Sequence, residues 1–158
     1  MLFYLIYFFI IFYIVIGIII LSEIAGYLWH RFAAHTDILH INLIHETHKI
    51  HHDADLTHEA HEDFFWLILL LTIMGIFVWY QPFLNRKYAI IIYLIVVIVF
   101  VWNWYIHSAY HISNHWLNNY DWFKKDKKIH FQHHINPWSN YGIASHFSDI
   151  ICGTFDRS

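Results

Sequence analysis

The sequence contains very little cysteine and little charge. Cys152 is the single cysteine among 158 residues, so the chain has no disulfide framework and no thiolate metal site; we interpret it as a small buried residue. Only 13% of the residues are charged, against about a quarter in typical soluble domains. The few basic residues form no stripe interleaved with aromatic residues, which argues against nucleic acid as a partner.

Long apolar stretches take the place of charge, and hydrophobic residues make up 58% of the chain. The first stretch is unbroken from Leu2 to Leu21, and only Ser22 and Glu23 interrupt it before Trp29. A membrane span needs about 20 apolar residues. The alternative, a signal peptide, lacks the basic start, the short apolar core and the small-residue cleavage site that such peptides have. We therefore expect a retained span.

Two further apolar stretches, 64–80 and 88–106, are separated by polar residues that indicate a turn at 81–87. Aromatic residues typical of membrane interfaces lie near their ends, namely Trp66, Trp79, Tyr80, Trp102, Trp104 and Tyr105. The chain is thus expected to be one all-α domain over 1–158. It would be an integral membrane helical bundle of three, at most four, spans, with the predicted spans at about 2–29, 64–80 and 88–106.

Counting these spans places every histidine on one side of the membrane. Most basic residues share that side, whereas Arg86 and Lys87 lie on the other. The positive-inside rule then makes the histidine face cytoplasmic. The lysine-rich run 124–128 is interpreted as a solvated or headgroup-facing patch, with docking of an acidic redox partner as the alternative.

Ten of the 16 histidines fall into four groups with recurring spacing: His30, His35, His48, His51, His52, His107, His111, His130, His133 and His134. Positions i, i+3 and i+4 share a helix face, so each of the two HxxHH triplets can converge on a common point. His107 and His111 form an i, i+4 pair. His30 and His35 do not share a face on a regular helix. Either the helix end unwinds there or the two serve different metals.

Neutral imidazole suits iron, zinc, copper and nickel. Ten imidazoles are too many for one ion, because zinc normally takes four ligands, so the pattern predicts two ions with four to five nitrogens each. An irregular histidine-rich buffer or transporter loop would not repeat helical spacing.

Other chemistries fail on their motifs. The runs His45–His48 and His58–His61 are each one residue short of the HExxH motif of metalloproteases, and no GxSxG nucleophile motif is present. The predicted spans contain no histidine for bis-histidine haem. No flavin, haem or nicotinamide motif is visible, so electrons for redox chemistry must come from outside.

The order of these motifs resembles the fatty acid hydroxylase and sterol desaturase superfamily. HRFxxH follows a first span, HxIHH comes shortly after, HxxxH ends a two-span hairpin, and HxxHH follows. The tail is similar to the closing NYG…D…GT pattern of that superfamily, at Asn140-Tyr141-Gly142, Asp149 and Gly153-Thr154. The resemblance covers about 23–155. Many members have four spans, and the fused b-type cytochrome domain of some fatty acyl hydroxylases is absent here.

The resemblance implies that the ten grouped histidines are the metal ligands, with no catalytic residue beyond them. It further implies a cytosolic histidine-rich helical cap and two iron ions, with zinc as a substitute in purified protein. O2 would be the co-substrate, and an external donor of the b-type cytochrome or ferredoxin type would supply electrons. Carboxylates and other polar groups usually orient ligating histidines, and the candidates for this role are Asp149, Glu23, His45 and Asn140.

The expected activity is therefore O2-dependent hydroxylation of a C–H bond in a lipid, whether fatty acyl, sphingolipid or sterol. The alternatives are a β-carotene hydroxylase of the same superfamily, a lipid desaturase, and a non-enzymatic metal transporter or sensor. The membrane would be the endoplasmic reticulum in a eukaryote or the inner membrane in a bacterium. The remaining histidines are expected mostly at interfaces or on the surface, and they are His40, His45, His58, His61, His115 and His146.

Overall fold

A computed structural model describes residues 2–36, 38, 42–53 and 61–157, and these residues form helices and connecting loops without a β-strand. The elements in chain order are α1 (Leu2–Trp29), the π-helix η1 (His30–Ala34), α2 (Asn42–Asp53), α3 (His61–Tyr80), α4 (Arg86–His111), the short 3₁₀ helix η2 (Trp116–Asn119), α5 (Asp121–Ile135) and α6 (Phe147–Cys152). The predicted all-α class is confirmed.

Two helical segments are long and apolar enough to cross a membrane, Phe3–Ala34 and Arg86–His111. Only 6% and 11% of their most apolar windows are buried inside the protein, so neither is the core helix of a soluble fold. A helix that is apolar all round and unburied by its own chain fits a lipid environment. The apolar part of α3, Phe64–Tyr80, is shorter, and its predicted role as a third span stays a prediction.

The predicted turn between the second and third apolar stretches is confirmed. The side-chain oxygen of Gln81 accepts hydrogen bonds from the backbone N–H groups of Phe83 and Leu84, each at 2.8 Å. The side-chain oxygen of Asn85 then accepts from Lys87 N at 3.0 Å, which caps the first turn of α4. These bonds reverse the chain, so α3 and α4 pack antiparallel as a hairpin.

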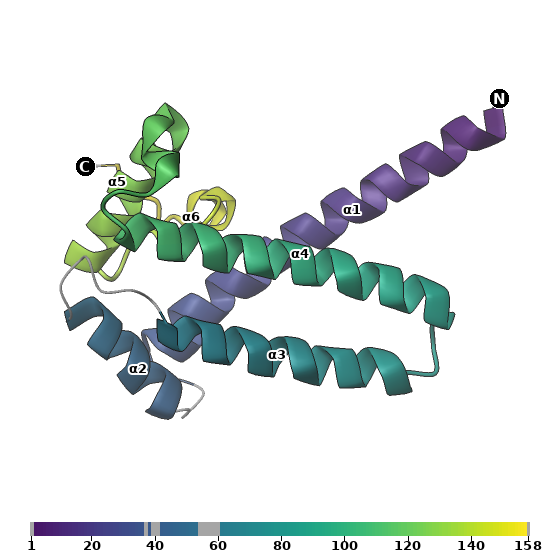
Figure 1. Cartoon of the computed structure of the whole chain (residues 1–158), viewed down its shortest axis with the longest axis horizontal. Helices are drawn as coiled ribbons and strands as arrows, with labels where there is room; N and C mark the ends of the chain where they lie inside the picture. The colour runs from purple at the N-terminus through teal and green to yellow at the C-terminus, as the bar shows by residue number, and fades with distance from the viewer. Residues whose placement is uncertain (1, 37, 39–41, 54–60, 158) are drawn as a thin grey trace.

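The histidine-bearing segments gather at one end of this arrangement (Figure 1). The first half of α1 stands apart from the other helices, and α1 then crosses α4 obliquely. The end of α4, helix η1 and the shorter helices α2 and α5 come together at the end opposite the α3–α4 turn. The expected histidine-rich cap at one end of the bundle is therefore present.

Small apolar clusters support this end. One consists of buried Ile106, Ala109, Tyr110, Leu117 and Phe123, which join the end of α4 to η2 and the start of α5. Another joins η1 to α2. The candidate site is thus supported by packing between helices that follow one another in the chain.

Cys152 is exposed at the end of α6, so its interpretation as a buried residue is wrong. Helix α6 packs on α1 and turns Ser148 and Asp149 inward, where they are buried. Ile150 and Ile151 consequently face outward with Cys152.

Candidate metal centre

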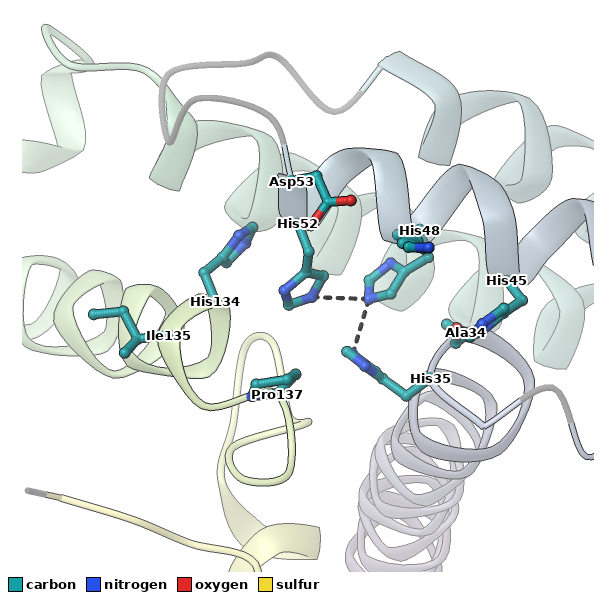
Figure 2. Close-up of a pocket in the computed structure, with 10 residues that line it drawn as sticks. Ala34, His35, His45, His48, His52, Asp53, His134, Ile135 and Pro137 are labelled. Atoms are coloured by element: carbon teal, nitrogen blue, oxygen red, sulfur yellow. Dashed lines mark hydrogen bonds between the residues drawn. The ribbon is translucent and has the colours of Figure 1, made fainter.

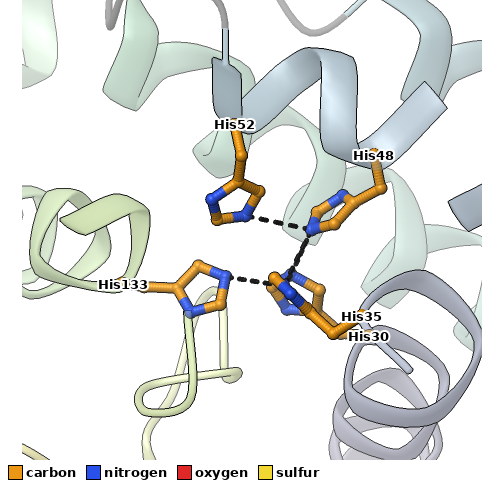
Figure 3. Close-up of side chains that lie close together, drawn as sticks. All are labelled: His30, His35, His48, His52 and His133. Atoms are coloured by element: carbon orange, nitrogen blue, oxygen red, sulfur yellow. Dashed lines mark hydrogen bonds between the residues drawn. The ribbon is translucent and has the colours of Figure 1, made fainter. Parts of the chain in front are cut away.

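All ten grouped histidines come together, in two clusters of five. Cluster A comprises His30, His35, His48, His52 and His133, and cluster B comprises His51, His107, His111, His130 and His134. Within each cluster, one ring nitrogen from every histidine lies within 4.8 Å of the others. Figure 3 shows the rings of cluster A turned toward a common centre; they come from η1 and the residue that follows it, from α2 and from α5.

The HxxHH triplet of α2 divides between the clusters. His48 and His52 belong to cluster A, whereas His51 belongs to cluster B. Consecutive residues on an α-helix point about 100° apart, so His51 and His52 diverge, while the i, i+4 pair stays together. The prediction that each triplet converges on one point is therefore wrong.

The triplet of α5 divides in the opposite sense. His130 and His134 belong to cluster B, and His133 reaches into cluster A. The two clusters touch where the His52 and His134 rings stack with centroids 4.3 Å apart. Each HxxHH helix thus links the two clusters, and the clusters form one binuclear arrangement.

His30 and His35 share cluster A because the chain forms a π-helix between them. The backbone N–H of His35 donates to the carbonyl of His30, five residues earlier, at 3.2 Å, and their Nε2 atoms lie 3.3 Å apart. Single π turns inside helices are frequently found at functional sites. Widening of the turn, rather than unwinding or service to different metals, brings the pair together.

The ring nitrogens of cluster A lie at the separations expected for ligands of one metal ion. The Nε2 atoms of His30, His35 and His48 form a triangle with separations of 3.0, 3.3 and 2.9 Å. A neutral imidazole nitrogen either donates or accepts, so three mutually adjacent Nε2 atoms cannot all pair. Nitrogens bound at about 2.1 Å to one ion, at right angles, lie about 3.0 Å apart. The donor set therefore fits a metal ion.

Two rings of cluster A are oriented by backbone carbonyls. The Nδ1–H of His30 donates to the carbonyl oxygen of Tyr141 at 2.6 Å, and that of His133 donates to the carbonyl oxygen of Ser139 at 2.6 Å. This places the Nδ1 proton and leaves the Nε2 lone pair facing the cluster centre, as ligating histidines require. Sequence reasoning missed these two acceptors, although Tyr141 lies within the closing motif.

Burial holds several of the clustered rings neutral. Burial, followed by the neighbouring imidazoles, lowers the pKa of His48, His130 and His133 well below the usual value. The same causes lower the pKa of His35 to about 2 and that of His52 to about 4. Neutral imidazoles offer lone pairs to metal ions near neutral pH.

Acidification should therefore destabilise the metal-free protein. A histidine whose pKa is lower in the folded protein binds a proton more readily in the unfolded chain, whose imidazoles have a pKa of about 6.5. The free energy of unfolding is therefore unaffected above this pH, and it decreases as the pH falls from there toward the pKa of the folded protein. We expect the unfolding midpoint to drop between pH 7 and pH 5, with an upper bound of about 1.4 kcal/mol per pH unit for each ring that stays neutral. Thermal unfolding in detergent measures this, and a flat profile would contradict the burial of neutral rings.

Asp149 is fully buried but acts on the loop rather than on a histidine ring. One carboxylate oxygen accepts hydrogen bonds from Tyr141 N at 2.9 Å and from the Thr154 hydroxyl at 2.7 Å, and the other accepts from Gly142 N at 2.7 Å. The expectation that Asp149 directly orients a ligand is thus corrected to an action through the Tyr141 peptide.

Asn140 holds the same loop to the C-terminal segment. Its side chain exchanges two hydrogen bonds with the backbone of Asp156, at 2.9 and 2.8 Å. Its backbone has a φ of 56°, in the left-handed region that asparagine tolerates better than most residues. Asn140 therefore shapes the turn between the carbonyls of Ser139 and Tyr141.

The two other candidates behave differently from each other. The Nδ1–H of His45 donates to the carbonyl oxygen of Ala34 at 2.8 Å, beside His35 in the chain; its expected role in orienting a ligating histidine stays a prediction. The half-buried Glu23 side chain hydrogen-bonds Ser145 and lies in electrostatic range of His146 and Asp149. Glu23 therefore makes a polar contact between α1 and the loop before α6.

Of the other histidines, His115 and His146 lie outside both clusters and are half-buried. His115 contacts the Tyr105 hydroxyl through Nε2 at 3.2 Å. His40 and His58 fall outside the described residues, as does the side chain of His61.

A cavity of about 350 Å³ opens onto the clusters between η1, α2 and the end of α5 (Figure 2). His35 and His52 of cluster A and His134 of cluster B line it, together with Lys49 and Asp53. The cavity therefore connects both clusters with the outside between the shorter helices, and not between the long apolar helices.

A family model described as fatty acid hydroxylase matches residues 2–154 of the chain. No curated protein and no solved structure matches the chain significantly.

Proposed function

The chain belongs to the fatty acid hydroxylase family, and from that premise we propose that it is a membrane di-iron oxygenase that hydroxylates a C–H bond of a lipid. The observation that carries the proposal is the pair of five-histidine clusters, which match the donor set of a binuclear site. The ten histidines of clusters A and B are proposed as the ligands.

Two iron ions, when bound, would supply the electrons that cleave O2 and insert one oxygen atom into the C–H bond. The balance requires the lipid, O2, two electrons and two protons, and yields the alcohol and water. Because the chain carries no motif for a redox cofactor, the electrons are proposed to come from a separate carrier of the b-type cytochrome or ferredoxin type. Zinc could replace iron in purified protein without supporting the reaction, since it has no redox chemistry.

The chain's own residues position the reaction. The carbonyls of Tyr141 and Ser139 hold the Nδ1 protons of His30 and His133, so these rings keep fixed orientations. Buried Tyr110 stacks on the His130 ring of cluster B and excludes water from that side. Because His107 and His111 lie in the last turns of α4, a lipid that reaches the end of this helix from the bilayer arrives at the clusters.

The membrane arrangement belongs to the same proposal. Helices α1, α3 and α4 would span the bilayer, and the histidine end would face the cytoplasm because most basic residues lie on that side. A non-enzymatic metal transporter or sensor would bind ions at the same clusters, which a cavity opens to the outside, and would differ from an enzyme in that it changes no lipid. Lipid desaturation and carotenoid hydroxylation use a similar centre and are separated by the product.

The deciding experiment is expression in a lipid-producing host under ¹⁸O2, with mass spectrometry of the lipids. A hydroxylase gives a product that carries one labelled oxygen atom, a desaturase gives one that has lost two hydrogen atoms, and a carotenoid hydroxylase labels a ring instead of an acyl chain. The variant His133→Ala, inserted at the wild-type level, should give none of these products. A wild-type protein that binds metal but changes no lipid would overturn the oxygenase proposal.

A further inference from the structure

Two candidate ligands of cluster A depend on one short loop, residues 139–142, which we call the closing loop. We propose that Asp149 is a positioning residue that fixes the metal affinity of cluster A through this loop, and that it acts on cluster B far less. The proposal rests on the metal centre of the proposed function. It adds that the two clusters differ in how strongly their metal affinity depends on Asp149.

The Asp149 carboxylate is buried and binds the backbone of the closing loop. It is 0% exposed, and its two oxygens accept three hydrogen bonds, from Tyr141 N, Gly142 N and the Thr154 hydroxyl. An ionised carboxylate is an acceptor only, so it matches three converging donors. The carboxylate therefore sets the position of the peptides on both sides of Tyr141.

The second step links those peptides to the cluster. The Tyr141 carbonyl accepts from His30 at 2.6 Å, and the Ser139 carbonyl, two residues earlier, accepts from His133 at 2.6 Å. The Tyr141 ring also lies against the rings of these two histidines and of His35, with centroids 5.4–5.8 Å away. A shift of the closing loop would thus move the support of cluster A as a unit.

The third step closes the chain of contacts on α1. Thr154 Oγ1 contacts the Tyr27 hydroxyl at 3.1 Å as well as donating to Asp149. Tyr27 lies three residues before His30, on the helix that delivers it. The contacts therefore run from His30 through Tyr141, Asp149 and Thr154 back to α1. They fix the His30 side chain both through its backbone on α1 and through its Nδ1 hydrogen bond.

The link to cluster B is longer. The hydroxyl of Tyr110 donates to the carbonyl oxygen of Ile143 at 3.2 Å, and its ring stacks on His130 at a centroid distance of 5.1 Å. This contact passes through an aromatic ring and not through a hydrogen bond to a candidate ligand. Loss of the Asp149 carboxylate should therefore weaken cluster A first.

The test is anaerobic titration of the purified full chain in detergent with ferrous iron alone, followed by graded chelation and measurement of the iron-to-protein ratio. Wild type should hold two ions per chain. Asp149→Asn turns an amide NH2 toward donors that the carboxylate accepted, so one ion should be lost about 10–100-fold more readily while the other stays. The matched control, Asp121→Asn, alters an exposed carboxylate and should hold both ions.

Thr154→Val keeps the inference testable if Asp149→Asn does not fold, because it removes only the hydroxyl donor. It should weaken the same single ion to a smaller extent, with helix content unchanged by circular dichroism. Equal loss of both ions, or full retention of both, in a folded variant would overturn the positioning role. A wild type that binds two ions and oxidises no lipid would instead overturn the proposed function and leave this inference standing.

Discussion

Alanine at His48 or at His130 should each lower lipid product formation by at least about 100-fold, since even the partners behind metal ligands are worth 10–100-fold. The Nε2 of His48 lies 2.9–3.1 Å from the Nε2 atoms of three neighbours in cluster A. The Nε2 of His130 lies 3.0 and 3.1 Å from those of His111 and His134 in cluster B. Each substitution removes a central nitrogen from one cluster and should therefore cost that cluster its ion. Because the proposed reaction uses both ions, either loss should abolish it.

The measurement is product per unit of inserted protein in the expression host, together with iron content. His115→Gln is the matched control, because His115 lies outside both clusters and its side chain serves the turn at η2; it should retain nearly wild-type activity. If either cluster variant kept substantial activity, the reaction would need only one of the two clusters, and the binuclear proposal would fail.

Alanine at Gly142 should cost about 1–3 kcal/mol of stability, as overpacking in a tight site does, and should reduce activity at least tenfold. A Cβ at this position would overlap the carbonyl oxygen of Ser145 and lie 2.8 Å from Oδ2 of Asp149. A backbone oxygen cannot move aside as a flexible side chain can, so the closing loop itself must shift. The carbonyl of Tyr141 would then leave His30.

Thermal unfolding in detergent and the product assay together measure this effect. Gly26→Ala is the matched control, because a Cβ there meets nothing within 4 Å and alanine favours a helix over glycine by about 1 kcal/mol. It should be at least as stable as wild type and fully active. A Gly142→Ala protein with wild-type stability and activity would show that the closing loop tolerates displacement, and the support described for cluster A would then be wrong.

In the closing motif, the sequence pattern predicts which residues support the site but not the contacts that they make. Asp149 and Asn140 were identified as residues that support the metal centre, and both are buried beside it. Their partners could not be predicted, because the acceptors for His30 and His133 are main-chain carbonyls, which every residue carries. The bond from His30 to Tyr141 joins residues 111 positions apart, and nothing in the local sequence specifies that pairing.

The helical class, the long apolar segments and the choice of the ten histidines follow from the sequence alone, because apolar length and helical spacing are properties of single segments. Which five histidines form each cluster depends instead on contacts between helices. That division depends on how α2 and α5 are rotated against the ends of α1 and α4, and on the π turn that unites His30 with His35. Rotation between helices is set by packing across the whole bundle, so no segment carries it alone.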